Sequence, residues 1–530
     1  ITHSFFSYAD TSILADLETG SPSSLRSAVS KIRKSSFDYS DTDRALLAVA
    51  GGIMQIAWPN EPVTWEIPET AGTDPYTGAV ASARLGVYDT NTGKNDFLTL
   101  VLPSLVLLTV PSKTDFFAES EHDLLAALEL NSRSVLAQYL LGVLYYRTHR
   151  FEQALEHFSA AREIDADCFE LTYMTGMTCL ALNDYADAYA LGSQLLGLHP
   201  QNADALKLCA ESSFALGDYD SAELFVAQVL QQEPENAYYV LFRVRVLIEK
   251  RDFVRAASLL DVYGRTDRTS RDYLLLRARI QEEWNKNAAA AASTMEDALI
   301  RYPDDETVIL AAARLADTAN RELAGRTAAE LAGRILDTDP DNLEALTVSV
   351  HAAVKEERWQ AAYDTNRYLI ELTSPEVPFA VSLQQVDICI ALENLSEAFD
   401  IADSLYRADP SNEAACAAYI RVLAAQGRTA EALALIEDRL GQSPSQQFKS
   451  FLYYERGMMR RSGADRLADF RQSLTANPRN ADTLFQLYRY YFDQSDYRKA
   501  QYYLRQAVAL NPDNQYLLSL TAELEALLAR

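Results

Sequence analysis

Small, apolar and aromatic residues stand at fixed intervals along this chain. Between Leu140 and Asp165 the sequence LLGVLYYRTHRFEQALEHFSAAREID carries a glycine, paired tyrosines, an alanine, a phenylalanine and further alanines, with the polar segment RTHR between its two apolar blocks. Alanine and leucine abound elsewhere, and the Asn-Gly and Asp-Gly pairs typical of hairpin turns are absent. The pattern and the residue types predict a mostly helical chain.

The intervals follow a period of about 34 residues. Counted from Val135 as position 1, Gly142 falls at position 8, Ala154 at 20, Phe158 at 24 and Ala161 at 27. This pattern resembles the tetratricopeptide repeat family, in which each unit forms two antiparallel helices. The resemblance implies that the small residues let the paired helices approach closely, that aromatic residues fill the space beside them, and that a proline ends the second helix.

The same intervals recur down the chain. Position 20 is alanine again at Ala188, Ala222, Ala256, Ala362, Ala398, Ala432 and Ala500. Prolines that end units are Pro200, Pro234, Pro303, Pro340, Pro410, Pro444, Pro478 and Pro512. Units can be placed that start near residues 135, 169, 203, 237, 272, 306, 343, 379, 413, 447 and 481. We therefore predict an all-α fold, a right-handed tetratricopeptide repeat superhelix of about eleven helix-turn-helix units.

Residues 1–134 show no clean match to the repeat and are predicted to form a mostly helical N-terminal segment. SPSSLRSAVSKIRK, DTDRALLAVAGGIMQIAW and TDFFAESEHDLLAALELN are typical of helices, and the last resembles the end of a degenerate repeat. The stretch from residue 60 to 95 predicts a long loop or a short strand pair. The array is expected over residues 135–514, followed by a capping helix over residues 515–530.

The formal net charge of −27 argues against two classes of partner. Nucleic acids and anionic lipid surfaces are bound mainly through neutralisation of their phosphate charge, and an acidic chain repels them. A soluble, self-repelling surface accounts for the charge, and a dedicated acidic docking face is the alternative.

The sequence contains no recognisable catalytic or metal-binding motif. The five cysteines are scattered without a CxxC pair, and the six histidines lack ligand spacing. The Gly-Lys pair in GVYDTNTGKN does not match a phosphate-binding loop, because the glycine spacing differs and Asn95 follows the lysine. We therefore expect no cofactor, no metal site and no enzymatic activity.

The start of the sequence favours an exported protein. The chain opens at Ile1 with ITHSFFSYADTS, as expected after removal of a signal peptide or downstream of a lipid-anchor cysteine, although an arbitrary truncation would begin in the same way. A periplasmic protein or a membrane-anchored lipoprotein fits this start. The longest apolar run, from Phe97 to Val110, is shorter than the roughly 20 residues of a membrane-spanning helix and contains Pro103. We expect a buried helix there.

The repeat resemblance also implies where a partner would bind. In this family the first helix of each unit lines the concave side of the superhelix, and four of its positions, numbers 2, 5, 9 and 12, point into the groove. The candidates from the first four units are Tyr139, Tyr146, Tyr173, Phe214, Tyr238 and Arg245. Those near the other end are Phe451, Tyr454, Arg461, Phe485, Arg489 and Phe492. Aromatic and arginine side chains are typical binding anchors, and the alternative for each ring is packing against neighbouring helices.

These observations predict a non-catalytic scaffold that binds a protein or peptide segment in the groove, in the manner of exported bacterial repeat proteins that assist envelope assembly or transport. The tail-binding clamp of chaperone partners is not matched, because Glu211 stands where the clamp asparagine is needed beside Lys207. The alternative function is a carrier that holds a small molecule or lipid in an apolar pocket of the N-terminal segment, formed by residues 53–58 and 97–110.

Overall fold

The computed structural model describes residues 11–35, 41–66, 96–109, 117–442, 444–512 and 514–528. Within these ranges the regular elements are all α-helices and no β-strand forms, which confirms the predicted fold class. The chain divides into two compact units, residues 1–285 and 286–530, and the division falls inside the fifth predicted repeat. Most of the predicted loop, residues 67–95, lies outside the described residues.

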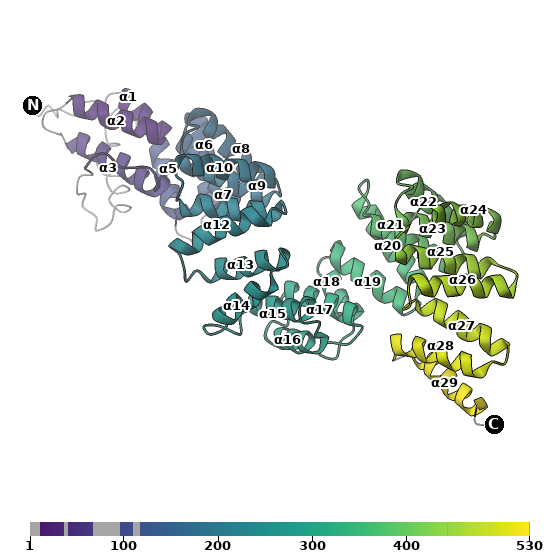
Figure 1. Cartoon of the computed structure of the whole chain (residues 1–530). Coiled ribbons are helices and arrows are strands. Elements are labelled where there is room, and N and C mark those ends of the chain that lie inside the picture. The colour runs from purple at the N-terminus through teal and green to yellow at the C-terminus, as the bar shows by residue number, and fades with distance from the viewer. Residues whose placement is uncertain are drawn as a thin grey trace, which may run out of the picture. The chain divides into compact units, whose positions relative to one another are not determined.

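The first unit begins with helices that precede the predicted array. These are α1 (Thr11–Thr19), α2 (Pro22–Ser35), α3 (Asp41–Ala57), α5 (Asp96–Thr109) and α6 (Phe117–Leu130). The array continues with α7 (Val135–Arg147), α8 (Phe151–Ile164), α9 (Phe169–Ala181), α10 (Tyr185–Leu198), α11 (Ala203–Ala215), α12 (Tyr219–Gln232), α13 (Ala237–Glu249), α14 (Phe253–Tyr263) and α15 (Arg271–Glu283). The two helices of each repeat from α7 to α14 pack against one another as antiparallel pairs (Figure 1).

The second unit continues the array to its end. Its helices are α16 (Ala288–Arg301), α17 (Glu306–Ala319), α18 (Ala328–Leu336), α19 (Leu343–Lys355), α20 (Trp359–Thr373), α21 (Phe379–Ala391), α22 (Leu395–Ala408), α23 (Glu413–Ala425), α24 (Thr429–Gly441), α25 (Gln446–Met459), α26 (Gly463–Ala476), α27 (Ala481–Asp493), α28 (Tyr497–Leu510) and α29 (Gln515–Leu528). From α17 onward the helices again pack in pairs, and the last helix, α29, packs against α28.

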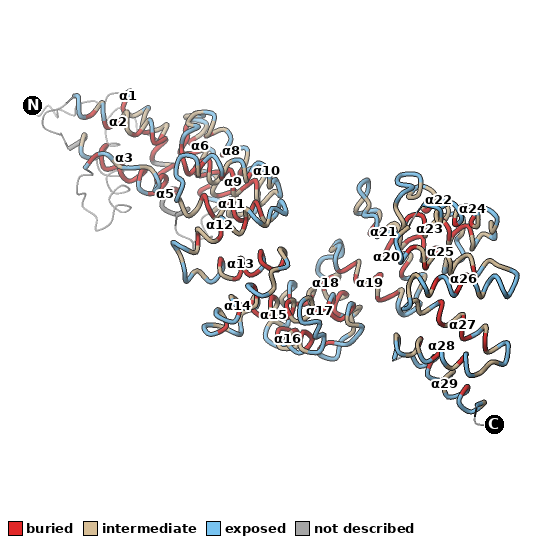
Figure 2. The backbone as a smooth tube through the Cα atoms, in the orientation of Figure 1, coloured by how far each residue is buried: buried red, intermediate tan, exposed pale blue. Residues whose placement is uncertain are grey.

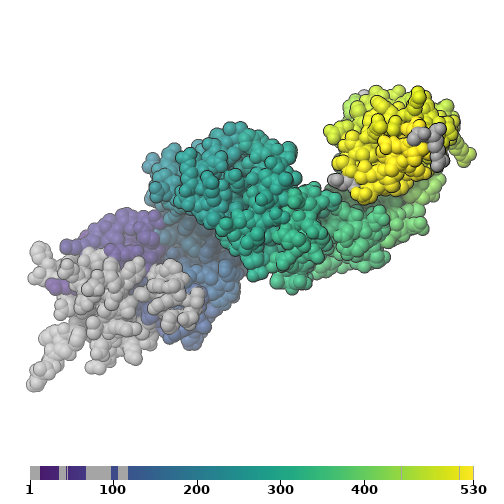
Figure 3. All heavy atoms as spheres, turned by 90° about the horizontal axis from the view of Figure 1, so that it is seen from below, coloured from purple at the N-terminus to yellow at the C-terminus, as the bar shows by residue number. Residues whose placement is uncertain are grey.

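In both units the first helix of a repeat also touches the first helix of the next repeat. Such contacts join α7 to α9, α9 to α11 and α13 to α15 in the first unit, and α17 to α19, α21 to α23 and α23 to α25 in the second. The first helices therefore form one side of each unit, which we call the first-helix surface. Figure 2 shows buried positions concentrated where neighbouring helices face each other, and in Figure 3 side chains fill the spaces between them.

The helices begin where the repeat pattern places them. The first helices α7, α9, α11, α13, α17, α19, α21, α23 and α27 start at the predicted residues, and α15 and α25 start one residue earlier. An asparagine at the N-cap accepts a hydrogen bond from the first turn of the helix, which satisfies a free backbone N–H. Asparagines in this role are Asn202, Asn236, Asn342, Asn412 and Asn480. The recurring Pro-x-Asn phrases of the sequence are thus the caps of successive repeats.

In every predicted repeat except the tenth, the turn between the two helices holds a residue in the left-handed conformation. His149, Asn183, Gly217 and Arg251 occupy this position with φ between 59° and 78°, and they stand 34 residues apart. Later repeats use Asn320, Glu357, Glu393, Gly427 and Ser495 in the same place. The conformation disfavours residues with a Cβ atom, because that atom crowds the following carbonyl oxygen. The backbone therefore repeats even where the side chain does not.

Small residues allow the helices of a pair to approach closely. A Cβ atom on Gly142 would lie 2.5 Å from Cε1 of Phe158, which is fully buried in α8. Gly457 of α25 is equally close to its partner helix, because a Cβ atom there would lie 2.7 Å from Phe470. The position of Gly142 against Phe158 bears out the packing that the resemblance implies, whereas Gly457 stands at position 11, where an aromatic residue was expected.

The helices before the array share one hydrophobic core with the first repeat. This core contains Leu17, Leu25, Ile53, Trp58, Trp65, Phe97, Leu98, Leu105, Leu140 and Phe158, among others. The apolar run predicted to form a buried helix is α5, whose described side chains join this core. Apart from the exposed Gln55, the described side chains that motivated the carrier hypothesis thus lie largely in the packed interior of the first unit.

Loops account for the repeats that depart from the pattern. After α14, which lacks its proline, Asp267 Oδ1 accepts hydrogen bonds from the backbone N–H groups of Thr269 and Ser270. The extra residues of the sixth repeat form loop 320–327, which ends in a capping box between Thr327 and Glu330. In the tenth repeat the turn between α25 and α26, residues 460–462, has the usual three residues, but none of them has a positive φ.

Two further properties bear on the chemistry of the chain. Among the helices that the structure describes, none combines the length and the apolar character needed to cross a membrane. All five cysteines are buried free thiols, and burial raises the pKa of Cys209 and Cys416 to about 11. At neutral pH these thiols are therefore protonated and poorly reactive.

Candidate binding surface

A cluster of tyrosines surrounds one carboxylate on the first-helix surface of the first unit. Glu211 of α11 accepts a hydrogen bond of 2.7 Å from the hydroxyl group of Tyr239 of α13. Burial raises the pKa of Tyr146 of α7 and of Tyr173 of α9, and the negative charge of Glu211 raises both further. Four successive first helices therefore contribute to one cluster.

An exposed arginine and an exposed tyrosine complete this cluster. The guanidinium of Arg245 lies over the ring of Phe214, 5.1 Å from its centroid. Tyr238 stacks on Phe242, with centroids 6.3 Å apart, and 52% of Tyr238 is exposed. Arg245 is also exposed. The structure thus brings together five of the residues predicted from the sequence, which are Tyr146, Tyr173, Phe214, Tyr238 and Arg245.

Tyr139, the sixth candidate in this unit, is covered by the chain itself. Its ring lies 4.6 Å from that of Trp58 and 6.0 Å from that of Phe158, measured between centroids. The residues after Trp58 cross the neighbouring repeats, because the backbone N–H of Asn60 donates to Glu170 Oε1 of α9 at 2.6 Å. Asn202, which caps α11, donates to Asn60 Oδ1 at 3.3 Å. Tyr139 is therefore a packing residue, the alternative considered for each ring.

The candidates of the second unit mostly pack against other rings. Phe451 stacks on Phe448, and Tyr454 lies against Phe470. Phe485 contacts Tyr488 and Tyr516, and Phe492 contacts Tyr488 and Tyr497. All four candidates remain partly exposed, and Arg489 is exposed.

Arg461 does not lie on a first helix. The helix α25 ends at Met459, so Arg461 belongs to the short turn before α26. Counted from residue 447, Arg461 stands at position 15, which is a turn position in the other repeats and not one of the four groove positions. Position 12 of this repeat is Met458, so the expectation for Arg461 does not follow from the repeat.

A row of charged residues on the first helices was not predicted. Position 9 of four successive repeats is occupied by Asp387, Arg421, Glu455 and Arg489, which are 34 residues apart. Their charges alternate along α21, α23, α25 and α27. The spacing of these charged residues is visible in the sequence. A search limited to aromatic and arginine anchors does not consider the two carboxylates of the row.

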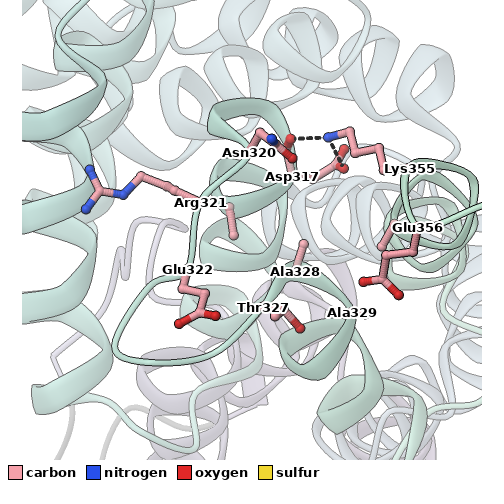
Figure 4. A pocket seen from close by; sticks show the side chains of 11 residues that line it. Asp317, Asn320, Arg321, Glu322, Thr327, Ala328, Ala329, Lys355 and Glu356 are labelled. Carbon is pink, nitrogen blue, oxygen red and sulfur yellow. Dashed lines mark hydrogen bonds and ion pairs between the residues drawn. The ribbon is translucent and has the colours of Figure 1, made fainter. Parts of the chain in front are cut away.

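A pocket of about 240 Å³ lies beside loop 320–327 of the second unit. In Figure 4, the Lys355 ammonium group donates to the backbone carbonyl of Asp317 and, at 2.8 Å, to its Oδ1 atom. His351 Nδ1 lies 3.1 Å from Asp317 Oδ2. These side chains are hydrogen-bonded to one another. The lining of the pocket contains none of the residues predicted to bind a partner.

Comparisons with known proteins identify the repeats. One family model described as tetratricopeptide repeat matches residues 180–243, 214–280 and 390–452, and a second matches residues 113–167 and 145–203. No curated protein matches the chain. The match from residue 113 includes α6, in agreement with a degenerate repeat before Val135.

Solved structures of repeat proteins are similar to this chain. The chain is 12% identical to yeast Tom70, with a TM-score of 0.38, over 75% of this chain and 97% of Tom70. It is 18% identical to PilF of Pseudomonas aeruginosa, with a TM-score of 0.33, over 40% of this chain and 93% of PilF. A tetratricopeptide repeat protein of Parabacteroides merdae is 16% identical, with a TM-score of 0.34, over 44% of this chain and 90% of its own.

The fold defines the class of this protein as an α-solenoid of paired helices. Within that class the chain contains tetratricopeptide repeats, which the two family models match within residues 113–280 and 390–452. Proteins with these repeats serve generally as scaffolds for interactions between proteins.

Proposed function

We propose that this protein is a non-catalytic scaffold that binds a partner polypeptide on its first-helix surface. The observation that carries the proposal is the cluster around Glu211, in which aromatic side chains of four successive first helices surround one carboxylate. The proposed contact residues are Tyr146, Tyr173, Phe214, Tyr238 and Arg245.

The chemistry of the cluster suits a polypeptide ligand. Tyrosine and arginine bury a large area and hydrogen-bond while losing little rotamer freedom, so they are enriched among residues that dominate binding energy. Tyr238 offers an exposed ring, and Arg245 offers the donors of a guanidinium that packs on Phe214. A backbone carbonyl or carboxylate of the partner would accept from Arg245, and an apolar side chain would pack on Tyr238.

The chain itself sets one limit of the proposed site. Trp58 covers Tyr139, and Asn60 is held by Glu170 and Asn202. The surface that a partner can reach therefore starts at Tyr146 and extends toward Arg245. This limit removes Tyr139 from the proposed contact set.

A comparison of variants of the full-length chain tests this proposal. The double variant Tyr238→Ala, Arg245→Ala removes both exposed groups, and Leu224→Ala on the second helix α12 is the control, because Leu224 is 59% exposed. Partner recovered by affinity purification from the native cell should bind the double variant at least tenfold more weakly, since loss of a dominant anchor costs about 2 kcal/mol or more. The circular dichroism spectrum should be unchanged. Equal recovery with both variants would contradict the proposal.

A further inference from the structure

The alternating charges on the first-helix surface of the second unit are not all paired. Arg421 of α23 forms an ion pair with Asp387 of α21, and its Nη1 atom lies 2.7 Å from Asp387 Oδ1. This pair joins two of the four charges in the row. The next carboxylate along the row, Glu455 of α25, makes no ion pair or hydrogen bond with any residue that the structure describes.

Glu455 lies in surroundings that disfavour its negative charge. It is only partly exposed, and burial raises its pKa to about 7, with Asp482 of α27 adding to the rise and Arg421 opposing it. Among the residues that the structure describes, Arg421 is the cation that acts on it, and that cation is already paired with Asp387. A new cationic partner stabilises such a carboxylate more than it would stabilise a fully solvated one. The reason is that folding has already removed part of the water around the carboxylate.

Aromatic rings lie on the helix that carries this carboxylate and on the next first helix. Phe485 stands one helical turn after Asp482 on α27 and contacts Tyr516 of α29, which is 62% exposed. On α25, Phe451 stands one turn before Glu455 and remains partly exposed. A half-buried carboxylate on a surface that also carries aromatic rings is complementary to a side chain that combines an apolar stem with a positive head.

We propose that the first-helix surface of α23, α25 and α27 binds a partner segment that presents a lysine or arginine side chain to Glu455 and an apolar side chain to Phe485. Charge complementarity selects this occupant, because the surface holds an unpaired carboxylate and the chain carries a net charge of −27. This inference rests on the proposed function, since it names the chemistry of a partner that lies on the first-helix surface.

Peptide selection on the full-length chain tests the inference. A phage library of random dodecapeptides is panned on the wild-type protein, and enriched peptides are synthesised and titrated against variants by fluorescence anisotropy. Glu455→Gln removes the charge and keeps the shape, whereas Asp400→Asn on the exposed face of the second helix α22 is the matched control. Phe485→Ala reports whether a peptide lies on this surface, and Tyr238→Ala with Arg245→Ala reports binding in the first unit.

We expect the enriched peptides to carry a lysine or arginine next to an apolar residue. They should bind Glu455→Gln at least tenfold more weakly than the wild type and bind Asp400→Asn as tightly as the wild type. Peptides that depend on Phe485 but lack a basic residue and ignore Glu455→Gln would overturn the inference alone. Peptides that depend only on Tyr238 and Arg245 would also overturn it and leave the proposed function intact. An absence of enriched peptides, or peptides indifferent to all these variants, would overturn both.

Discussion

The indole ring of Trp58 lies against the ring of Tyr139, with centroids 4.6 Å apart. Trp58 is fully buried, and its Nε1 atom donates to the carbonyl oxygen of Gly20 at 2.8 Å. Tyr139 belongs to the first predicted repeat, whereas Trp58 and Gly20 belong to the segment before the array. The contact therefore makes the N-terminal segment a packed extension of the solenoid and occupies the part of the first-helix surface nearest to it.

Replacement of Trp58 by alanine should loosen the start of the array. Loss of a fully buried aromatic side chain leaves a cavity and costs roughly 3–5 kcal/mol. Hydrogen exchange followed by mass spectrometry should show faster exchange in α3 and α7, with exchange in α27 and α28 unchanged. Leu224→Ala is the control, since an exposed substitution shifts stability by only about 0.5 kcal/mol. Unaltered exchange in α7 would contradict the role assigned to Trp58.

Two glycines of the first unit should respond to alanine in opposite directions. Gly142→Ala places a methyl group 2.5 Å from Phe158, and the resulting overpacking should lower stability by about 1–3 kcal/mol. Gly197→Ala in α10 meets no atom within 4 Å, so the higher helix propensity of alanine should raise stability by up to about 1 kcal/mol. Thermal melts of the two variants measure the difference. A shift of the same sign in both would contradict the packing described here.

The repeat fold could be predicted from the sequence because its packing rule is local and periodic. Gly142, Phe158 and the asparagine caps each act within one repeat, so their spacing reveals the helix boundaries. The contact of Trp58 with Tyr139 joins distant parts of the chain and follows no period, so no sequence pattern predicts it. Arg461 was misplaced because it occupies position 15 of the tenth repeat, which is a turn position. Glu455 was overlooked because its lack of an ion-pair partner follows from the pairing of Arg421 with Asp387, which only the structure shows.

The left-handed position of the repeat turn gives a further pair of opposite effects. Gly217 has a φ of 78°, and a Cβ atom added there would meet no atom within 4 Å. Gly217→Ala therefore adds backbone strain alone and should cost about 1 kcal/mol. Glu357 holds the equivalent conformation with a φ of 57°, so Glu357→Gly should relieve strain and raise stability by a few tenths of a kcal/mol. Denaturant titration of both variants is the measurement. A loss of stability in Glu357→Gly would show that its side chain stabilises the turn.

The stability of the second unit should fall as pH rises through neutrality. Burial raises the pKa of Glu455 from 4.5 to about 7 in the folded protein, so the folded state holds this proton more tightly than the unfolded state. The resulting stabilisation is complete below about pH 4.5 and is lost as pH rises through 7. Glu455→Gln lacks this titration. Its free energy of unfolding relative to that of the wild type should therefore rise by on the order of 2 kcal/mol between pH 5 and pH 8.

Melting curves at pH 5 and pH 8 measure the effect of Glu455, with Asp400→Asn as the control that should follow the wild type. Parallel losses of stability in Glu455→Gln and the wild type would contradict the raised pKa. They would leave the geometry of the Asp387–Arg421 pair untouched.

The central claim is that a partner polypeptide binds on the first-helix surface, and site-specific photo-crosslinking tests it most directly. A benzophenone amino acid replaces Tyr238 on the first helix α13 or, in a matched variant, Leu224 on the second helix α12, and the full-length chain is irradiated in its native cell. We expect a discrete crosslinked product from position 238 and none from position 224. Crosslinking from position 224 alone would contradict the claim and place the partner on the opposite side of the repeats.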